Sequence, residues 1–116
     1  MSITVEDKSF QFALRVVKLC HYLREEKKEF TLSKQLLRAG TSIGANVAEA
    51  QQAQSRLDFI NKLNIALKEA VETNYWLRLM YAAEYMSKPQ FDSIISDCKE
   101  LEKMLTSIIK TTRGQG

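Results

Sequence analysis

Few side chains in this sequence could perform chemistry, and their spacing builds no reaction centre. His21 is the only histidine, and no carboxylate precedes it at the Glu-x-x-His step that a di-metal helical bundle requires. A nucleophilic triad needs its histidine beside a serine or cysteine in a turn, whereas His21 lies within a helical pattern. Glu69 and Glu72 can lie near each other on a helix, but such pairs usually belong to a solvated face. We therefore expect no catalytic residue, no metal, no cofactor and no enzymatic activity.

Two other patterns that could hold a ligand are better explained by folding. Cys20 and Cys98 stand among apolar neighbours, which favours buried, reduced thiols over a disulfide. The segment from Gly40 to Gly44 lies inside a helical pattern and lacks the Lys-Ser/Thr pair of a phosphate-binding loop. Together with Ala48, these glycines recur every four residues, and each internal Gly costs a helix roughly 1 kcal/mol against Ala. We expect this column of small residues to allow close approach of a neighbouring helix.

Basic side chains offer a different chemistry, which is contact with phosphate. They share one face of the helix expected near the N-terminus and recur at the start of the next helix. We favour a solvated face and keep phosphate contact as the alternative, because the formal net charge of +3 is mild and three glutamates lie between the two helices. The candidate nucleic-acid contacts are Lys8, Arg15, Lys18, Lys34 and Arg38.

Apolar residues at alternating steps of three and four predict four helices separated by short connections. Thr4 and Ser55 stand at positions typical of N-caps, and Ser87 with Gln90 forms a capping box that has Pro in its first turn. The expected helices cover about residues 6–27, 32–53, 56–86 and 88–112.

One stripe of each helix is predicted to face the core. The longest run without Gly or Pro lies in the third helix, where Val71 is expected to widen the stripe. The fourth helix has the most regular helical spacing of apolar residues in the chain. In the first helix the predicted core stripe is Phe10, Ala13, Leu14, Val17 and Cys20, with Val16 and Leu23 beside it.

The second half of the third helix is apolar almost all round. Tyr75, Trp76 and Leu79 point away from the predicted core stripe, so a monomer would leave them in water. Aromatic anchors of this kind are typical of interfaces. We expect these three residues to form an oligomer interface, with coverage by another helix of the same chain as the alternative.

Length and composition indicate one helical domain over residues 1–116. One Pro and four Gly leave little material for turns, which favours long helices over many short strands. No stretch approaches the roughly 18 consecutive apolar residues of a membrane span, and the first residues show no export signal. We expect a cytoplasmic, all-α, up-down-up-down antiparallel four-helix bundle.

The second and third helices carry a recognisable motif. The sequence resembles the bacterial four-helix-bundle proteins first noticed in intervening sequences of 23S ribosomal RNA genes. Ala50 departs from the Gly that is typical of the motif, which is expected to let the second helix run one turn longer. The matching residues are Arg38, Ala39, Ser42, Ile43, Asn46, Ala48 and Glu49, followed by Phe59, Leu63, Ala66 and Glu72.

The resemblance implies a fold and an oligomeric assembly more than a particular biochemical function. Relatives form ring-shaped homopentamers, and the fold is shared by a nucleic-acid-binding accessory protein that works beside a reverse transcriptase. We expect a non-enzymatic, self-associating binding or scaffold subunit, with a nucleic-acid-binding accessory protein as the alternative. The motif also holds a column of polar residues, Ser42, Asn46 and Glu49. We expect these side chains to satisfy buried or interfacial hydrogen bonds between helices. Contact with a ligand or a nucleic acid is the alternative.

Overall fold

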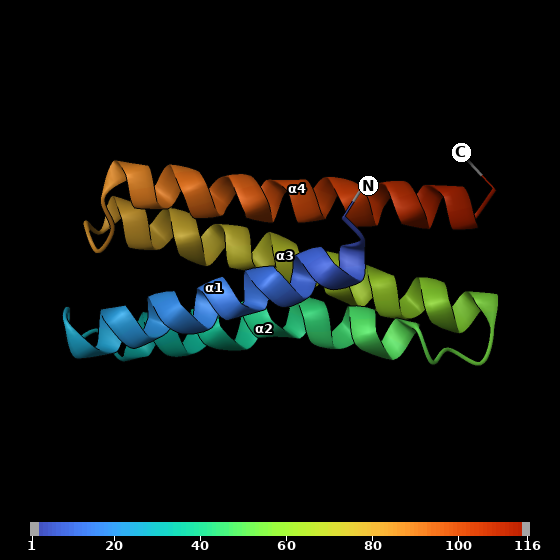
Figure 1. Ribbon diagram of the computed structural model, residues 1–116, viewed down its shortest axis with the longest axis horizontal. Helices are drawn as coiled ribbons and strands as arrows, with labels where there is room; N and C mark the ends of the chain where they lie inside the picture. Colours follow the sequence, from blue (N-terminus) through green and yellow to red (C-terminus); the bar gives the residue numbers. More distant parts are fainter. Residues whose placement is uncertain (1–2, 115–116) are drawn as a thin grey trace.

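A computed structural model describes residues 3–114 as four helices that run up, down, up and down. The helices lie along one axis in a rod of 45 × 24 × 22 Å (Figure 1). This confirms the predicted all-α antiparallel bundle. The helices are α1 (Val5–Glu25), α2 (Thr31–Ala50), α3 (Arg56–Ala82) and α4 (Lys88–Thr112).

The predicted N-caps are confirmed at three helices. The Thr4 and Ser55 hydroxyls accept hydrogen bonds from backbone N–H groups three residues later, at 3.1 and 3.0 Å. Ser87 and Gln90 bond each other's backbone reciprocally before α4. Each cap satisfies donors that the first helical turn leaves without partners. These interactions span only three residues, so the sequence reveals them directly.

The start of α2 uses a different device. The nearly buried Glu29 carboxylate accepts hydrogen bonds from the backbone N–H groups of Leu32 and Ser33, at 3.0 and 2.7 Å. The Ser33 hydroxyl donates back to the Glu29 carbonyl oxygen at 2.8 Å. A negative charge at this end also complements the helix dipole. Glu29 is therefore a folding residue rather than part of a solvated connector.

Three helices end earlier than predicted. α1 stops at Glu25 and α3 at Ala82, each followed by a non-Gly residue in the left-handed region: Lys28 at φ +55° and Glu84 at φ +68°. Such a residue breaks the helical path, and its usual sequence marker is Gly. α2 ends at Ala50 and turns away, so the expected extra turn is wrong.

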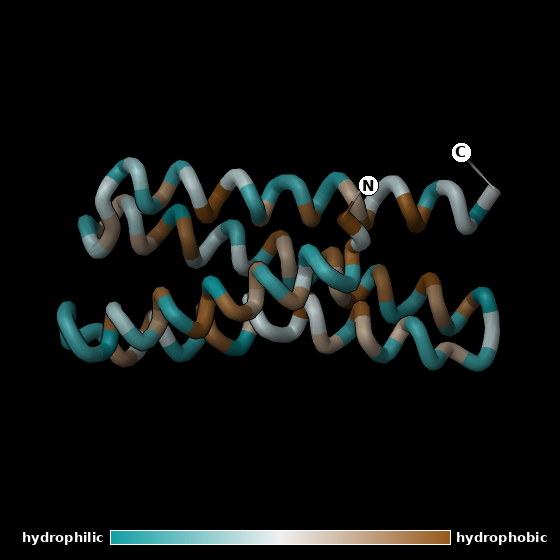
Figure 2. Tube along the Cα trace, in the orientation of Figure 1, coloured by the Kyte–Doolittle hydropathy of each residue, from teal (hydrophilic) through white to brown (hydrophobic). Residues whose placement is uncertain are grey.

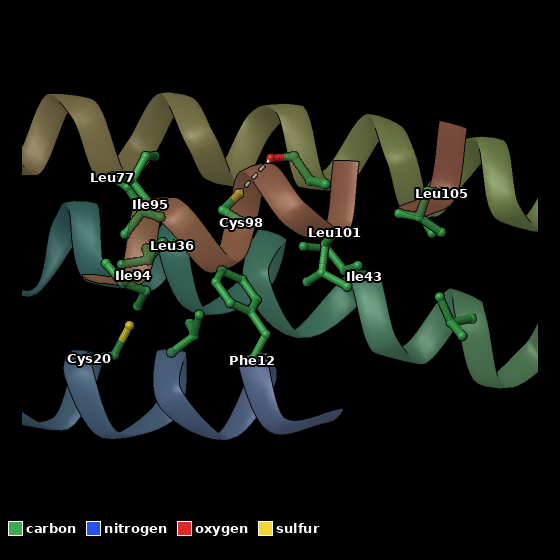
Figure 3. Packing of buried hydrophobic residues seen from close by; sticks show 14 of the residues in the cluster. Phe12, Cys20, Leu36, Ile43, Leu77, Ile94, Ile95, Cys98, Leu101 and Leu105 are labelled. Carbon is green, nitrogen blue, oxygen red and sulfur yellow. Dashed lines mark hydrogen bonds between the residues drawn. The ribbon is translucent and has the colours of Figure 1, made fainter. Parts of the chain in front are cut away.

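The buried stripe of α1 is only partly the one predicted: Cys20 is buried as expected, but the stripe runs through the flanking residues and not through Phe10, Leu14 and Val17. Phe12, Val16 and Leu23 are buried, whereas Phe10, Leu14 and Val17 are 73, 47 and 45 % exposed. Figure 3 shows Phe12 and Cys20 pointing from α1 toward core residues such as Leu36 and Ile43 of α2. Figure 2 shows hydrophobic residues recurring along all four helices. Both stripes of α1 have helical spacing, so periodicity alone misplaced the centre of the buried stripe.

The glycines of α2 allow close contact with α1, as predicted. A Cβ added at Gly44 would lie 3.2 Å from the Ser9 carbonyl oxygen, and one at Gly40 would lie 2.8 Å from both γ-carbons of Val16. Ala48, the third member of the column, is exposed. The glycines therefore set how near α1 lies to α2. The contact between α1 and α4 is much smaller.

Along residues 3–114, no helix has the length and apolar character needed to cross a bilayer.

Candidate interaction surfaces

Two predicted phosphate contacts, Lys8 and Arg15, are held by a carboxylate of α4. Lys8 Nζ lies 2.9 Å from one Asp97 oxygen, and Arg15 lies 2.5 Å from the other. Lys8 also approaches Glu100 at 3.4 Å. Burial alone would raise the Asp97 pKa, but hydrogen bonds from the two cations outweigh burial and lower the pKa below its usual value. The face carrying these cations therefore packs toward α4 rather than pointing into solvent as predicted.

Arg38 is held by carboxylates of α3. It forms ion pairs with Glu69 at 3.2 Å and with Glu72. Glu72 also accepts a hydrogen bond from the Trp76 indole N–H at 3.0 Å. This network of a cation, two carboxylates and an indole joins α2 to α3 within one chain.

The remaining two candidates, Lys18 and Lys34, are exposed, and no carboxylate of residues 3–114 lies within ion-pair distance of them. Lys18 and Arg15 line a groove of about 290 Å³ between α1 and α4, together with Tyr22. Lys34 lies on α2 and is absent from that groove's lining. The five candidates thus form no single basic surface.

The polar column of the family motif makes mostly local bonds. The Ser42 hydroxyl donates to the Arg38 carbonyl oxygen at 2.6 Å, and the Asn46 amide donates to the Ser42 carbonyl oxygen at 2.8 Å. Glu49 accepts from Lys62 of α3 at 2.9 Å. Within one chain, only Glu49 bonds to another helix, whereas Ser42 and Asn46 bond to the backbone of α2 itself.

The predicted interface patch on α3 is divided between the inside and the outside of the bundle. Tyr75 is 49 % exposed, whereas Trp76 and Leu79 are half-buried. Trp76 packs against the core and contacts the edge of the Tyr75 ring, with centroids 5.1 Å apart. Of the three, Tyr75 offers the largest exposed fraction to a partner.

A surface that the sequence analysis missed lies on α1 and α2. Its members are the exposed apolar residues of α1 and two exposed alanines of α2, beside a hollow of about 300 Å³ that Glu6, Phe10 and Gly44 help to line. The sequence signal was present, but it was assigned to the core. We call this surface the α1–α2 face: Phe10, Leu14, Val17, Ala45 and Ala48.

A second hollow of about 600 Å³ lies between α3 and α4. Val71, predicted to be in the core, is 53 % exposed there, because Ala70 takes the buried position beside it. Lys103 and Lys110 of α4 line the same hollow. We call it the α3–α4 groove: Leu67, Val71, Glu102, Lys103, Thr106, Ser107 and Lys110.

Both cysteines are free and buried, as expected. Cys20 donates to the Ser33 carbonyl oxygen at 3.3 Å. Cys98 donates to the Ala70 carbonyl oxygen, also at 3.3 Å, and a dashed line marks this bond in Figure 3. Burial raises the pKa of Cys20 to about 11 and that of Cys98 to about 12. Because the thiolate is the reactive form, neither residue is suited to nucleophilic chemistry near neutral pH. Within residues 3–114, no three His, Cys, Asp or Glu residues are grouped so that they could hold a metal ion.

Comparison with known proteins agrees with this architecture. The sequence pattern of the 23S rRNA-intervening sequence proteins matches residues 1–107. The chain belongs to this family. One similar solved structure is that of a protein of unknown function from the S23 ribosomal protein family of Bacteroides thetaiotaomicron VPI-5482. Its sequence is 61 % identical to that of the present chain. The match covers 92 % of this chain and 99 % of that one, with a TM-score of 0.91.

A search of curated proteins finds no match. The predicted resemblance to the 23S rRNA-intervening sequence family is confirmed, and with it the four-helix fold.

Proposed function

We propose that this member of the 23S rRNA-intervening sequence family is a non-enzymatic, self-associating helical bundle that acts as a binding or scaffold subunit. The observation that supports the proposal is the exposed apolar stripe of α1, Phe10, Leu14 and Val17. A single exposed apolar residue is ordinary, but a patch continuous with a hollow is typical of an interaction site.

The stripe contributes little to the fold of the single chain. The buried stripe of α1 already packs against the other helices, and Phe12 and Val16 are at most 1 % exposed. The outer stripe therefore remains available to a partner, and removing apolar area from water gives roughly 25 cal/mol per Å². The family resemblance favours a homopentamer as the assembled state.

Light scattering coupled to gel filtration tests this proposal. At tens of micromolar, we expect a mass several times the 13.3 kDa of one chain. The mass should fall on dilution if the association is reversible. A parent protein that remains monomeric at these concentrations contradicts self-association.

The non-enzymatic part of the proposal is supported by residue chemistry. The only histidine, His21, is an exposed helical residue, and the two thiols are buried with raised pKa values. Hydrolase assays on the purified protein, with and without added divalent metal, should show no turnover above a buffer control. Turnover that follows the protein through purification would contradict this part.

Nucleic-acid binding is the second candidate, and the groove between α1 and α4 favours it. Arg15 and Lys18 line that groove, and Lys18 has no ion-pair partner among residues 3–114. Fluorescence anisotropy with single-stranded RNA and with duplex DNA tests it, over a series of salt concentrations. Lys18→Glu should weaken binding, and Lys62→Glu, which alters a lysine already paired with Glu49, is the matched control. Absence of salt-dependent binding removes this candidate.

A further inference from the structure

The groove between α1 and α4 has a different lining from the two hollows described above. It combines an apolar floor with two cations, and no carboxylate of residues 3–114 lines it. The hollow beside the α1–α2 face includes Glu6, and the α3–α4 groove includes Glu102. We call this third surface the α1–α4 groove: Arg15, Lys18, Leu19, Tyr22, Met86, Gln90 and Ile94.

We propose that the α1–α4 groove binds a small organic anion that has a planar aromatic body and one phosphate, sulfonate or carboxylate group. This inference goes beyond the binding or scaffold role, because it assigns a ligand class and a site within a single chain. It does not depend on self-association. Nucleic acid, the second candidate function, would use the same two cations, and competition between a small anion and RNA separates the two.

The fold keeps this groove open. The contact between α1 and α4 is much smaller than that of α1 with α2, and the C-terminal end of α1 lies away from the start of α4 (Figure 1). In the N-terminal part of α1, Lys8 and Arg15 join the two helices through Asp97. Beyond Arg15, no ion pair within residues 3–114 links α1 to α4. The groove therefore begins where the ion pairing ends.

Arg15 is fixed in place and still has donors for a ligand. Its Nη1 donates to Asp97 at 2.5 Å and to the Ser93 carbonyl oxygen at 3.4 Å, and its Nη2 donates to the Ser93 hydroxyl at 3.0 Å. A guanidinium has five N–H donors. The Nε–H and one Nη2 hydrogen therefore have no partner among residues 3–114.

Lys18 supplies the second cation at the rim of the groove. It is exposed, and it lies one helical turn after Arg15, so the two side chains share a face of α1. Asp97 offsets part of the Arg15 charge, whereas no carboxylate of the described chain pairs with Lys18. Lys18 thus provides most of the attraction for an anion, and Arg15 provides oriented hydrogen bonds.

The floor of the groove suits a compact aromatic body. Met86 and Ile94 are buried, and Leu19 and Tyr22 are half-buried. An aromatic ring and a methionine sulfur both pack favourably against a planar aromatic ligand. The volume of about 290 Å³ lies near the lower end of small-molecule sites, which span roughly 300–1,000 Å³. This size favours a small ring system over a long acyl chain.

The backbone at the start of α4 does not supply the anion site. The N–H of Gln90 donates to the Ser87 hydroxyl, and the Gln90 side-chain oxygen accepts from the Ser87 N–H. Pro89 has no N–H to donate. Recognition of the anionic group therefore depends on the side chains of Arg15 and Lys18.

Anilinonaphthalene sulfonate, an aromatic sulfonate whose fluorescence rises in apolar sites, is the probe for the full chain. We expect saturable binding to the parent, and Lys18→Glu should weaken it by roughly tenfold because a charge-assisted contact is lost. Lys34→Glu is the matched control, since Lys34 is another exposed lysine without an ion-pair partner in residues 3–114 and lies outside the groove. Equal weakening in both variants would reflect net charge alone and would overturn the inference, as would a parent that shows no saturable binding.

A second pair of variants tests the aromatic floor. Tyr22→Leu should weaken binding of the probe several-fold, because it removes the ring and keeps an apolar side chain, whereas Tyr22→Phe should retain the parent's affinity. Circular dichroism establishes that each variant is folded. Phe10→Asp, on the α1–α2 face, should leave binding unchanged. If Phe10→Asp abolishes binding and Lys18→Glu does not, the probe occupies the exposed stripe of α1 and the inference is wrong.

Competition against the bound probe identifies the ligand class. Displacement by adenosine monophosphate indicates a phosphate group, and displacement by naphthoate indicates a carboxylate; either supports the inference. Inorganic phosphate should displace the probe poorly, because it has no aromatic body. Phosphate that competes as well as adenosine monophosphate would overturn the inference. Displacement by single-stranded RNA but by neither small anion would also overturn it, in favour of nucleic-acid binding.

Discussion

The two sides of α1 have almost the same sequence pattern and opposite fates. Phe12 and Val16 lie at the centre of the bundle, whereas Phe10 and Leu14, at the same spacing, are largely in water. The difference arises from the neighbours, because Gly44 lies against the Ser9 backbone and the Gly40 site against Val16. Close packing on α2 therefore rotates one stripe inward and leaves a second apolar stripe of α1 exposed to solvent.

The largest expected effect separates the two stripes directly. Phe12→Ala should lower the free energy of unfolding by about 3–5 kcal/mol, because it leaves a cavity in the core. Phe10→Ala, at an exposed position, should change the stability of the single chain by less than about 0.5 kcal/mol. Chemical denaturation at concentrations below those of association measures both. Equal losses of unfolding free energy in the two variants would contradict the assignment of Phe12 to the core and Phe10 to the surface.

The close contact between Gly44 of α2 and the α1 backbone gives the next largest expected effect on stability. Gly44→Leu should cost on the order of 1–3 kcal/mol or more, because even its Cβ would lie 3.2 Å from the Ser9 carbonyl oxygen. Ala45→Leu is the control, since the adjacent Ala45 is exposed and should tolerate the larger side chain. The melting temperatures of the two variants should differ clearly. An unchanged melting temperature for Gly44→Leu would place that glycine away from α1.

The opposite flank of α1 is held by Asp97, which should have a smaller, pH-dependent effect. Asp97→Asn should cost about 1–2 kcal/mol near neutral pH, because it weakens charged hydrogen bonds to Lys8 and Arg15 at a partly exposed site. The folded-state pKa of Asp97 is lowered. Its stabilisation is therefore present above the ordinary Asp pKa of about 4 and is lost as the pH falls through the folded-state pKa.

Denaturation curves at neutral and acidic pH test the sign of this effect. The parent should lose more stability on acidification than Asp97→Asn does. The variant Asp92→Asn is the matched control, because Asp92 pairs with Lys88 within α4 and both side chains are well exposed. An Asp97→Asn variant with the parent's full pH dependence would contradict the role of this ion pair.

The smallest effect concerns where α1 ends. Lys28→Gly should raise the free energy of unfolding by a few tenths to about 1 kcal/mol, because Lys28 has a left-handed φ of +55° that Gly adopts more easily. Lys27→Gly is the control and should be neutral or destabilising, since Lys27 does not have a positive φ. Thermal unfolding compares the two. A gain in both variants would point to an effect unrelated to the left-handed conformation.

The sequence by itself determined the features that depend on neighbours within about one helical turn. The caps at Thr4, Ser55 and Ser87 each join residues three apart, and all three are present. The core stripe of α4 was also predictable, because that helix has only one apolar face. The number, order and direction of the helices followed from these local signals and the short connections between them.

Only the tertiary structure decided which of two equivalent stripes of α1 is buried, because that choice depends on a neighbouring helix some thirty residues away. The same reason explains the basic residues. Lys8 and Arg15 meet Asp97, and Arg38 meets Glu69 and Glu72, across separations of at least 31 residues. Helical periodicity places a side chain on a face of its own helix, and packing between helices determines what that face meets.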